Sequence, residues 1–249
     1  MHASLLAFSI LVSLAHAAPS PKLEISTTTV RNQLALAIHK GQPLKQVYAT
    51  LHHDLGPRAI ETLLEIANDE KAPDETRWAA LFGVARLSGK ESAAVLKKFM
   101  SNSNWMLRDA ALKATAALNI ASLKADVERR LKDDALIVRT TAVQTLTHLK
   151  SKTSAPKLVE ALFDPMNYYG TSGKKGLWIH KYILQALKDF RYEPAVPRLV
   201  ELLKSSTDTQ LQTQIIATLE TLTGKSFPGK AMPEQIYLWK RNTVSELSF

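Results

Sequence analysis

The chain has 249 residues, 45% of them hydrophobic, with a formal net charge of +9 and no cysteine. The lack of cysteine excludes disulfide bonds, thiolate metal sites and thiol nucleophiles, so packing alone must stabilise the fold. The basic excess favours anionic partners, which include acidic proteins, envelope polymers, membrane surfaces and nucleic acid.

Residues 1–17 are predicted to be a signal peptide. Ala3–Leu14 is an apolar run of the length of a signal-peptide hydrophobic region, and Ala15-His16-Ala17 follows it as a cleavage pattern of small residues. The alternative is a buried N-terminal helix. Cleavage after Ala17 predicts an exported protein, either periplasmic or secreted. No later segment has ~20 uninterrupted apolar residues, so we expect no transmembrane helix.

Helical periodicity dominates the rest of the chain. Residues 18–56 are predicted to form N-terminal helices, with an apolar stripe at Val30, Leu34 and Ile38 that ends at Gly41. Residues 225–249 are predicted to form a C-terminal cap. Between these segments, residues 57–224 are expected to fold as helix pairs: 58–67 with 74–87, 91–100 with 104–118, 123–131 with 136–149, 156–163 with 177–190, and 197–203 with 208–222. The expected N-caps include Asp74, Asn104 and Asp208.

A period of 31 residues runs through the predicted pairs. Arg77, Arg108 and Arg139 recur at this spacing, and a column of small residues follows each Arg at Ala80, Ala111 and Ala142. A constant period of this size is typical of a stacked repeat array. His180 and Gln212 take the Arg position in the next two units, at spacings of 41 and 32 residues. The sequence therefore predicts an insertion within the array, at about residues 164–176.

Two segments resemble a known repeat. "LKDDALIVRTTAVQTL" (131–146) is similar to the HEAT repeat, in which Asp precedes a Val-Arg pair, and "ALFDP" (161–165) resembles the turn after its first helix. The short period is most similar to bacterial HEAT-like repeats named after phycobilisome lyases. "LTGKSF" (222–227) with Trp239 resembles the closing segment of many exported bacterial HEAT-like proteins. The resemblance implies an all-α solenoid of about five to six antiparallel helix pairs, with a short C-terminal capping helix, that binds or scaffolds a partner.

The recurring arginines are expected to be structural. In the resembled repeat this Arg pairs with an Asp of its own or the next turn, and Asp133, Asn102 and Asp69 precede Arg139, Arg108 and Arg77 respectively. Such a ladder would satisfy backbone carbonyls in a partly buried seam. The alternative is a row of anion-binding sites.

The insertion supplies the first candidate binding residues: Tyr168, Tyr169, Lys174, Lys175 and Trp178. Insertions in repeat arrays map to loops on one face and are often where binding occurs. A second candidate cluster is Trp78, Phe82 and Trp105, which either expose aromatic rings or fill an irregular junction. We also expect that shortening 167–175 leaves the fold intact and weakens partner binding, with a tolerated surface loop as the alternative.

Catalytic and metal-binding patterns are missing from the sequence. It contains no His-Glu-x-x-His, P-loop, Gly-x-Ser-x-Gly or dinucleotide motif, and His52 and His53 are adjacent, so on a helix they point to different faces. We therefore predict a non-enzymatic protein without catalytic residues, metal or cofactor.

The leading interpretation is an interaction or scaffold module of the cell envelope. Its expected partner is another protein, acidic in character, or an anionic envelope polymer. One alternative is a nucleic-acid-binding or DNA-repair HEAT-like protein, which the predicted leader argues against. The other is a lyase-type accessory protein or chaperone, which rests on analogy of fold.

Overall fold

The computed structural model describes residues 25–170 and 175–246. The expected signal peptide, residues 1–17, and Lys174 lie outside these described residues. Within them the regular secondary structure is helical, apart from one isolated antiparallel bridge between Tyr168 and Gly176. The prediction of an all-α repeat solenoid is therefore confirmed.

The helices follow the predicted pairs within a few residues. Two N-terminal helices, α1 (Thr27–His39) and α2 (Leu44–Leu55), precede the array. The array consists of α3 (Arg58–Asn68) with α4 (Asp74–Ser88), α5 (Ala93–Phe99) with α6 (Trp105–Ala117), α7 (Lys124–Arg129) with α8 (Leu136–His148), α9 (Ala155–Ala161) with α10 (Ile179–Phe190), and α11 (Val196–Ser205) with α12 (Thr209–Thr223). The helix α13 (Met232–Glu246) closes it. Short 3₁₀ turns lie at Gly89–Ser92, Ala121–Leu123, Arg130–Lys132, Lys152–Ser154, Pro165–Asn167 and Glu193–Ala195.

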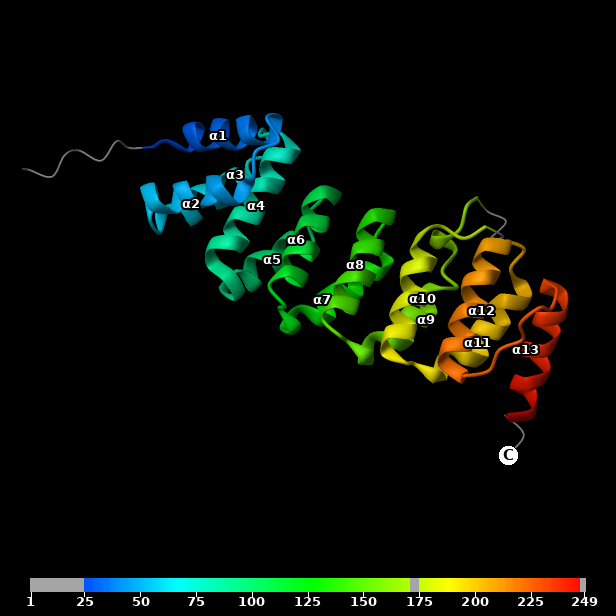
Figure 1. The fold of residues 1–249 in the computed structure, drawn as a ribbon. Helices are drawn as coiled ribbons and strands as arrows, with labels where there is room; N and C mark the ends of the chain where they lie inside the picture. The colour runs from blue at the N-terminus through cyan, green and yellow to red at the C-terminus, as the bar shows by residue number, and fades with distance from the viewer. Residues whose placement is uncertain (1–24, 171–174, 247–249) are drawn as a thin grey trace, which may run out of the picture.

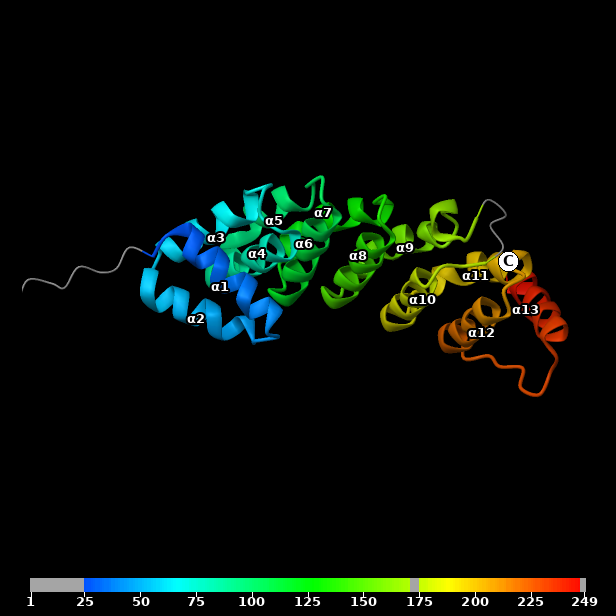
Figure 2. The ribbon, with the colours of Figure 1, turned by 90° about the horizontal axis from the view of Figure 1, so that it is seen from above.

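The pairs stack into an elongated, two-layered array (Figure 1). Each first helix packs on the second helix of its own pair, and the second helices α4, α6, α8, α10 and α12 contact one another in turn. From above, the second helices follow one side of the array and the first helices the other (Figure 2). Ala80, Ala111 and Ala142 are fully buried in the second helices. Small side chains at these crossings let the helices approach one another closely.

Helix starts differ in how they are capped. Asn104 and Asp208 accept hydrogen bonds from backbone N–H groups in the first turns of α6 and α12, as predicted. The prediction for Asp74 is wrong: Pro73 occupies the N-cap, and Asp74 is the first residue of α4. An acidic residue there still interacts favourably with the positive end of the helix.

Both ends of the array are covered by helices. At the N-terminal end, α1 and α2 pack on α3 and α4, and the Tyr48 hydroxyl donates to the Ala79 carbonyl at 2.7 Å. At the other end, α13 packs on α11. Its Trp239 is buried, with the Phe227 ring edge-on at a centroid distance of 5.2 Å. The helices α1, α2 and α13 therefore shield apolar surface that the outermost repeats would otherwise expose.

Candidate partner-binding site

Arg108, near the start of α6, connects its own repeat to the next one. Its guanidinium donates two hydrogen bonds to the Asp133 carboxylate, at 2.8 and 2.6 Å, and Nη1 donates to the carbonyl oxygens of Asn102 and Ser103 at 3.0 and 2.8 Å. Burial by itself would raise the pKa of the Asp133 carboxyl, but hydrogen bonds and the charge of Arg108 outweigh burial and hold this pKa below its ordinary value. The charges of Arg108 and Asp133 are thus paired with each other inside the fold.

Arg139 in α8 makes the corresponding connection across the insertion. Its side chain is buried, and Nε donates to Oδ1 of Asn167 at 2.8 Å. Nη1 donates to the Asp133 carbonyl at 2.7 Å, and Nη2 donates to the Met166 carbonyl at 2.6 Å. Asp133 therefore serves three arginines, with its carboxylate for Arg108 and Arg130 and its carbonyl for Arg139. This geometry favours a structural role for Arg108 and Arg139.

Arg77 has a different set of partners from the one expected. Its Nε donates to the Ala67 carbonyl at 3.1 Å, and the carboxylate of Asp74 lies 3.7 Å from Nη1. Asp69 pairs instead with Arg31 of α1, at 2.8 Å. The expected pairing of Arg77 with Asp69 is wrong, because the N-terminal helices supply another cation for that carboxylate.

The base of the insertion is paired backbone. Tyr168 and Gly176 form the antiparallel bridge, and the N–H of Tyr169 donates to the carbonyl of Lys175 at 2.8 Å. The segments on either side of residues 170–174 therefore run alongside each other. They hold the ends of the insertion against the array.

Asn167 and Tyr168 belong to the interior. Asn167 is fully buried, and its amide donates to the Ala161 carbonyl at 2.9 Å while its oxygen accepts from Arg139. The Tyr168 hydroxyl donates to the Leu162 carbonyl, and burial raises the pKa of this hydroxyl to about 12. The expectation that 167–175 can be shortened without loss of stability stays a prediction, but Asn167 and Tyr168 satisfy buried polar groups, so we exclude these two residues from the segment to be shortened. We accordingly treat Tyr168 as structural.

His180 stands where the earlier repeats have arginine. It is buried, with Nδ1 3.1 Å from the Leu177 carbonyl and Nε2 3.2 Å from the Leu162 carbonyl. Burial lowers the pKa of the imidazole, while these two hydrogen bonds and the charge of Asp208 act in the opposite direction. A neutral imidazole has one N–H and so donates to one of the two carbonyls.

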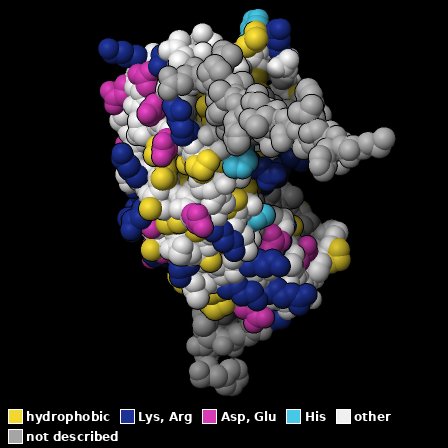
Figure 3. Space-filling model, turned by 90° about the vertical axis from the view of Figure 1, so that its left-hand side faces the viewer, with side chains coloured by type: hydrophobic (Ala, Val, Ile, Leu, Met, Phe, Trp, Pro, Cys, Tyr) yellow, Lys and Arg dark blue, Asp and Glu magenta, His cyan; other side chains and the backbone are white. Residues whose placement is uncertain are grey.

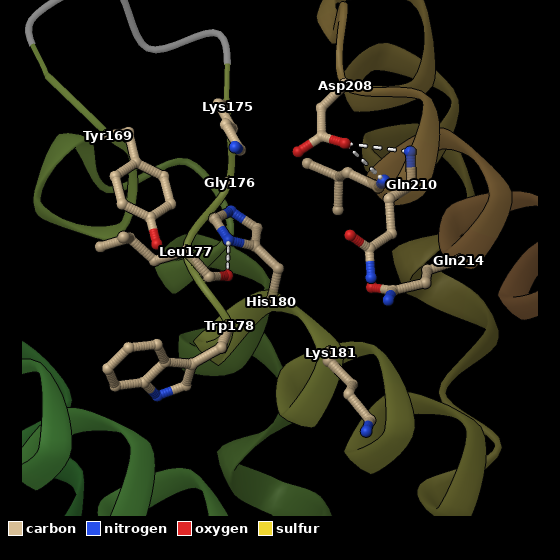
Figure 4. A pocket seen from close by; sticks show the side chains of 11 residues that line it. Tyr169, Lys175, Gly176, Leu177, Trp178, His180, Lys181, Asp208, Gln210 and Gln214 are labelled. Atoms are coloured by element: carbon tan, nitrogen blue, oxygen red, sulfur yellow. Dashed lines mark hydrogen bonds between the residues drawn. The ribbon is translucent and has the colours of Figure 1, made fainter.

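A pocket of about 310 Å³ opens between the insertion and the start of α12 (Figure 4). The rings of Tyr169 and Trp178 lie on one side of the view, and the side chains of Gln210 and Gln214 lie on the other. Its lining consists of Tyr169, Lys175, Gly176, Leu177, Trp178, His180, Lys181, Asp208, Gln210, Leu211 and Gln214. Three of the predicted insertion residues, Tyr169, Lys175 and Trp178, thus line one pocket.

Large apolar side chains remain exposed at the starts of consecutive second helices. Trp105 opens α6, Ile137 is the second residue of α8, and Trp178 directly precedes α10. Their exposed fractions are 45%, 37% and 52%, and Tyr169 beside the pocket is 51% exposed. We call these four residues the apolar row. Ile137 was missed in the sequence, where it is one more apolar residue of a helical pattern.

Hydrogen bonds between neighbouring helices set the register of the apolar row. Thr141 of α8 donates to Asp109 of α6 at 2.6 Å, and these residues lie four positions after Ile137 and Trp105 respectively. Trp105 and Ile137 therefore occupy the same turn of adjacent helices. The indole N–H of Trp178 donates to Thr140 of α8 at 3.1 Å, and Thr140 lies three residues after Ile137. The row therefore runs in register from α6 to the insertion.

Trp78 and Phe82 lie apart from the apolar row. They are half-buried in α4 and pack against the core, and their rings contact each other at an angle of 47° with centroids 4.5 Å apart. Their partial burial against the core favours a packing role over an exposed binding surface. Of the second predicted cluster, Trp105 is the residue that the fold leaves well exposed.

The described residues offer no cluster of three or more His, Asp or Glu side chains that is arranged to hold a metal ion. Among the helices in this part of the chain, none combines the length and apolar character needed to cross a bilayer.

On the face seen from the N-terminal end, Lys and Arg side chains are spread out with acidic side chains between them (Figure 3). The net charge therefore forms no single basic patch on that face.

Two solved structures are similar to this one. The complex of CpcE and CpcF of phycocyanin lyase from Nostoc sp. PCC7120 matches with a TM-score of 0.51 and 22% identity, over 67% of this chain and 65% of that chain. The matched part is thus slightly less than two thirds of that chain, and the likeness is one of fold, a HEAT-like helical repeat. An engineered protein matches with a TM-score of 0.47 and 18% identity, over 83% of this chain and 93% of the other. No family model and no curated protein matches the sequence.

Proposed function

We propose that this chain is a non-enzymatic, HEAT-like accessory protein that binds another protein across the layer of second helices. One observation carries the proposal: the apolar row leaves large side chains exposed in consecutive repeats. Exposed apolar side chains that form one continuous patch are typical of protein-binding surfaces. Solenoids commonly bind their partners along such extended faces.

The chemistry of the apolar row suits protein recognition. Trp and Tyr are enriched among the residues that contribute most to binding free energy, because they bury a large apolar area and keep one polar group available. The insertion places Tyr169 and Trp178 at one end of the row, and the start of α6 places Trp105 at the other. The partner would therefore contact at least three consecutive repeats.

The likeness to the CpcE–CpcF complex supports an accessory role. That protein is a helical repeat that functions in a complex of two chains, and the shared feature here is the fold. An accessory protein that holds a client polypeptide needs a packed array with an exposed apolar face, and this chain has stacked helix pairs with exposed apolar side chains. We favour this role over a scaffold of the cell envelope, for which the predicted leader is the main support.

Export remains part of the proposal. Ala15-His16-Ala17 predicts a mature protein that begins at Ala18. Sequencing of the N-terminus of protein from the exported fraction checks this directly. Recovery of Met1 from cytosolic protein would refute it and would reopen the nucleic-acid alternative.

Site-specific photo-crosslinking tests the binding surface. A photoreactive amino acid is placed at residue 105, 137 or 178 of the full chain, and at Tyr237 of α13 as a matched control, since Tyr237 is 59% exposed. We expect the same partner protein to be captured from the three positions in the row and not from residue 237. Capture at residue 237 alone, or equal capture at all four positions, would contradict the proposed surface.

A further inference from the structure

We infer that the pocket between the insertion and α12 receives a carboxylate group carried by an acidic side chain of the partner protein. The inference rests on the proposed function, because it specifies the chemistry of the partner at one end of the apolar row. It assigns Lys175 and Lys181 as the charges that attract the carboxylate to the pocket.

Two lysines border the pocket without an anionic partner. Among the described residues, neither Lys175 nor Lys181 forms an ion pair; their ammonium groups lie 5.4 Å from the Tyr169 ring and 6.0 Å from the Tyr182 ring. Figure 4 shows Lys175 above and Lys181 below the middle of the pocket. Many other cations of the array are already paired, as Lys113 is with Asp109 at 2.7 Å. These two lysines are therefore available to a ligand.

Among the described residues that line the pocket, Asp208 supplies the one carboxylate, and this group caps a helix. Oδ1 of Asp208 accepts hydrogen bonds from the N–H groups of Gln210 and Leu211, at 3.0 and 3.1 Å, as the N-cap of α12. Its negative charge lies at the positive end of that helix and is partly offset there. The pocket lining therefore carries two positive charges, on Lys175 and Lys181, and one negative charge, on Asp208, so its net charge is positive. The amides of Gln210 and Gln214 add hydrogen-bond donors on the α12 side.

The position of the pocket indicates where the carboxylate comes from. Tyr169 and Trp178 belong both to the apolar row and to the pocket lining, so a chain lying along the row reaches the pocket without a gap. A volume of about 310 Å³ is at the lower end for ligand pockets and suits a single side chain. The ammonium groups have the charge that attracts a carboxylate, and the neighbouring rings contact the aliphatic part of a Glu or Asp side chain.

Calorimetric titration of the full chain with a capped hexaglutamate peptide tests the inference. The site variant carries Lys175→Gln and Lys181→Gln. The control carries Lys98→Gln and Lys204→Gln, two exposed lysines outside the pocket, and has the same net charge. We expect the site variant to bind about tenfold more weakly than the native chain, and the control to bind within about twofold of it. A capped hexaglutamine peptide should not bind measurably.

Other outcomes would overturn the inference. Equal weakening in both variants would mean that net charge alone attracts the peptide, and no weakening in either would place the anion elsewhere. Tight binding of free glutarate at the pocket would identify a small carboxylic acid as the ligand instead of a partner side chain. If the lysine variant loses the peptide while residues 105, 137 and 178 capture no partner, the pocket stands and the proposed function fails. If capture persists but the peptide never binds, the proposed function stands and the carboxylate inference fails.

Discussion

At the scale of single residues, Arg139 makes four hydrogen bonds to buried and partly buried groups of its own repeat and the next one. Its guanidinium satisfies Asn167 and three backbone carbonyls, including those of Asp133 and Met166. Arg139→Ala leaves these groups unpaired, so we expect it to lower the free energy of unfolding by about 3 kcal/mol. Urea denaturation measures the change, with the exposed Lys132→Ala as control, expected within about 0.5 kcal/mol of the native chain. Full stability together with lost partner binding would make Arg139 a binding residue instead.

We expect His180 to make stability depend on pH. Its pKa in the folded state lies below its usual value of 6.5, because the ring is buried, so the unfolded chain binds the proton more readily. Stability is therefore complete above about pH 6.5 and falls as the pH drops below that value towards the folded-state pKa. His180→Gln introduces the side chain that Gln212 uses at the same repeat position, where its amide donates to the Ser206 carbonyl at 2.8 Å.

Melting temperatures of the native chain and His180→Gln, compared from pH 8 to pH 5, isolate this contribution. Glutamine does not titrate, so we expect the native chain to lose more stability than the variant below about pH 6.5. Parallel curves over the whole range would show that His180 does not titrate within the fold.

Gly83 shows why a helix-breaking residue is retained inside α4. A Cβ there would lie 2.9 Å from Leu63 Cδ1 and from Tyr48 Cε1, and the Tyr48 ring is held by its hydrogen bond to Ala79. Gly83→Ala gains about 1 kcal/mol of helix propensity. We expect the clash to outweigh this gain, with a net loss of about 1 kcal/mol in urea denaturation. A stabilised variant would mean that α2 shifts away without cost.

At the scale of elements, the described part of the insertion is a structural base in which a backbone hydrogen bond pairs Tyr169 with Lys175. Tyr169 and Lys175 are hydrogen-bonded neighbours, so a two-residue Asn-Gly turn in place of residues 170–174 can connect them. We expect this change to leave the melting temperature within a few degrees of the native value, because the pairing at the base stays intact. Asn167→Ala is the matched comparison and should destabilise the fold by about 2 kcal/mol. Unfolding of the shortened chain would show that residues 170–174 also brace the array.

The helix pairs follow from the sequence because their packing is periodic. The 31-residue spacing places Ala80, Ala111 and Ala142 in the same buried column, and local apolar patterns locate the helices within a few residues. The base of the insertion has no such signal. Asn167 binds Arg139 from 28 residues away, at a position outside the repeat pattern, and a nearby Gly-rich stretch resembles an open loop.

At the scale of the whole molecule, the site depends on the stacking of repeats. The sequence was enough to identify Tyr169, Lys175 and Trp178 as candidate binding residues. The opposite wall of the pocket lies at the start of α12, where the sequence shows Asp208 only as an N-cap and Gln210 only as an ordinary polar residue. Only the stacking of α10 on α12 makes these residues neighbours. Stacking also explains why Trp105 is exposed while Trp78 is half-buried, although both are aromatic residues near the starts of second helices.

The helix α13 covers the C-terminal end of the array, and we expect this cover to prevent association between chains through that end. It covers α11 with the buried Trp239, and an uncapped repeat would expose this apolar face. We expect Trp239→Ala to lower the free energy of unfolding by about 3–5 kcal/mol.

A chain that ends at Gly229 should form oligomers whose mass rises with concentration in light scattering after size exclusion. Tyr237→Ala on the exposed side of the helix is the control and should leave mass and stability unchanged. A monomeric truncated chain with the native melting temperature would show that the repeats need no cap, and α13 would then be available for a different role.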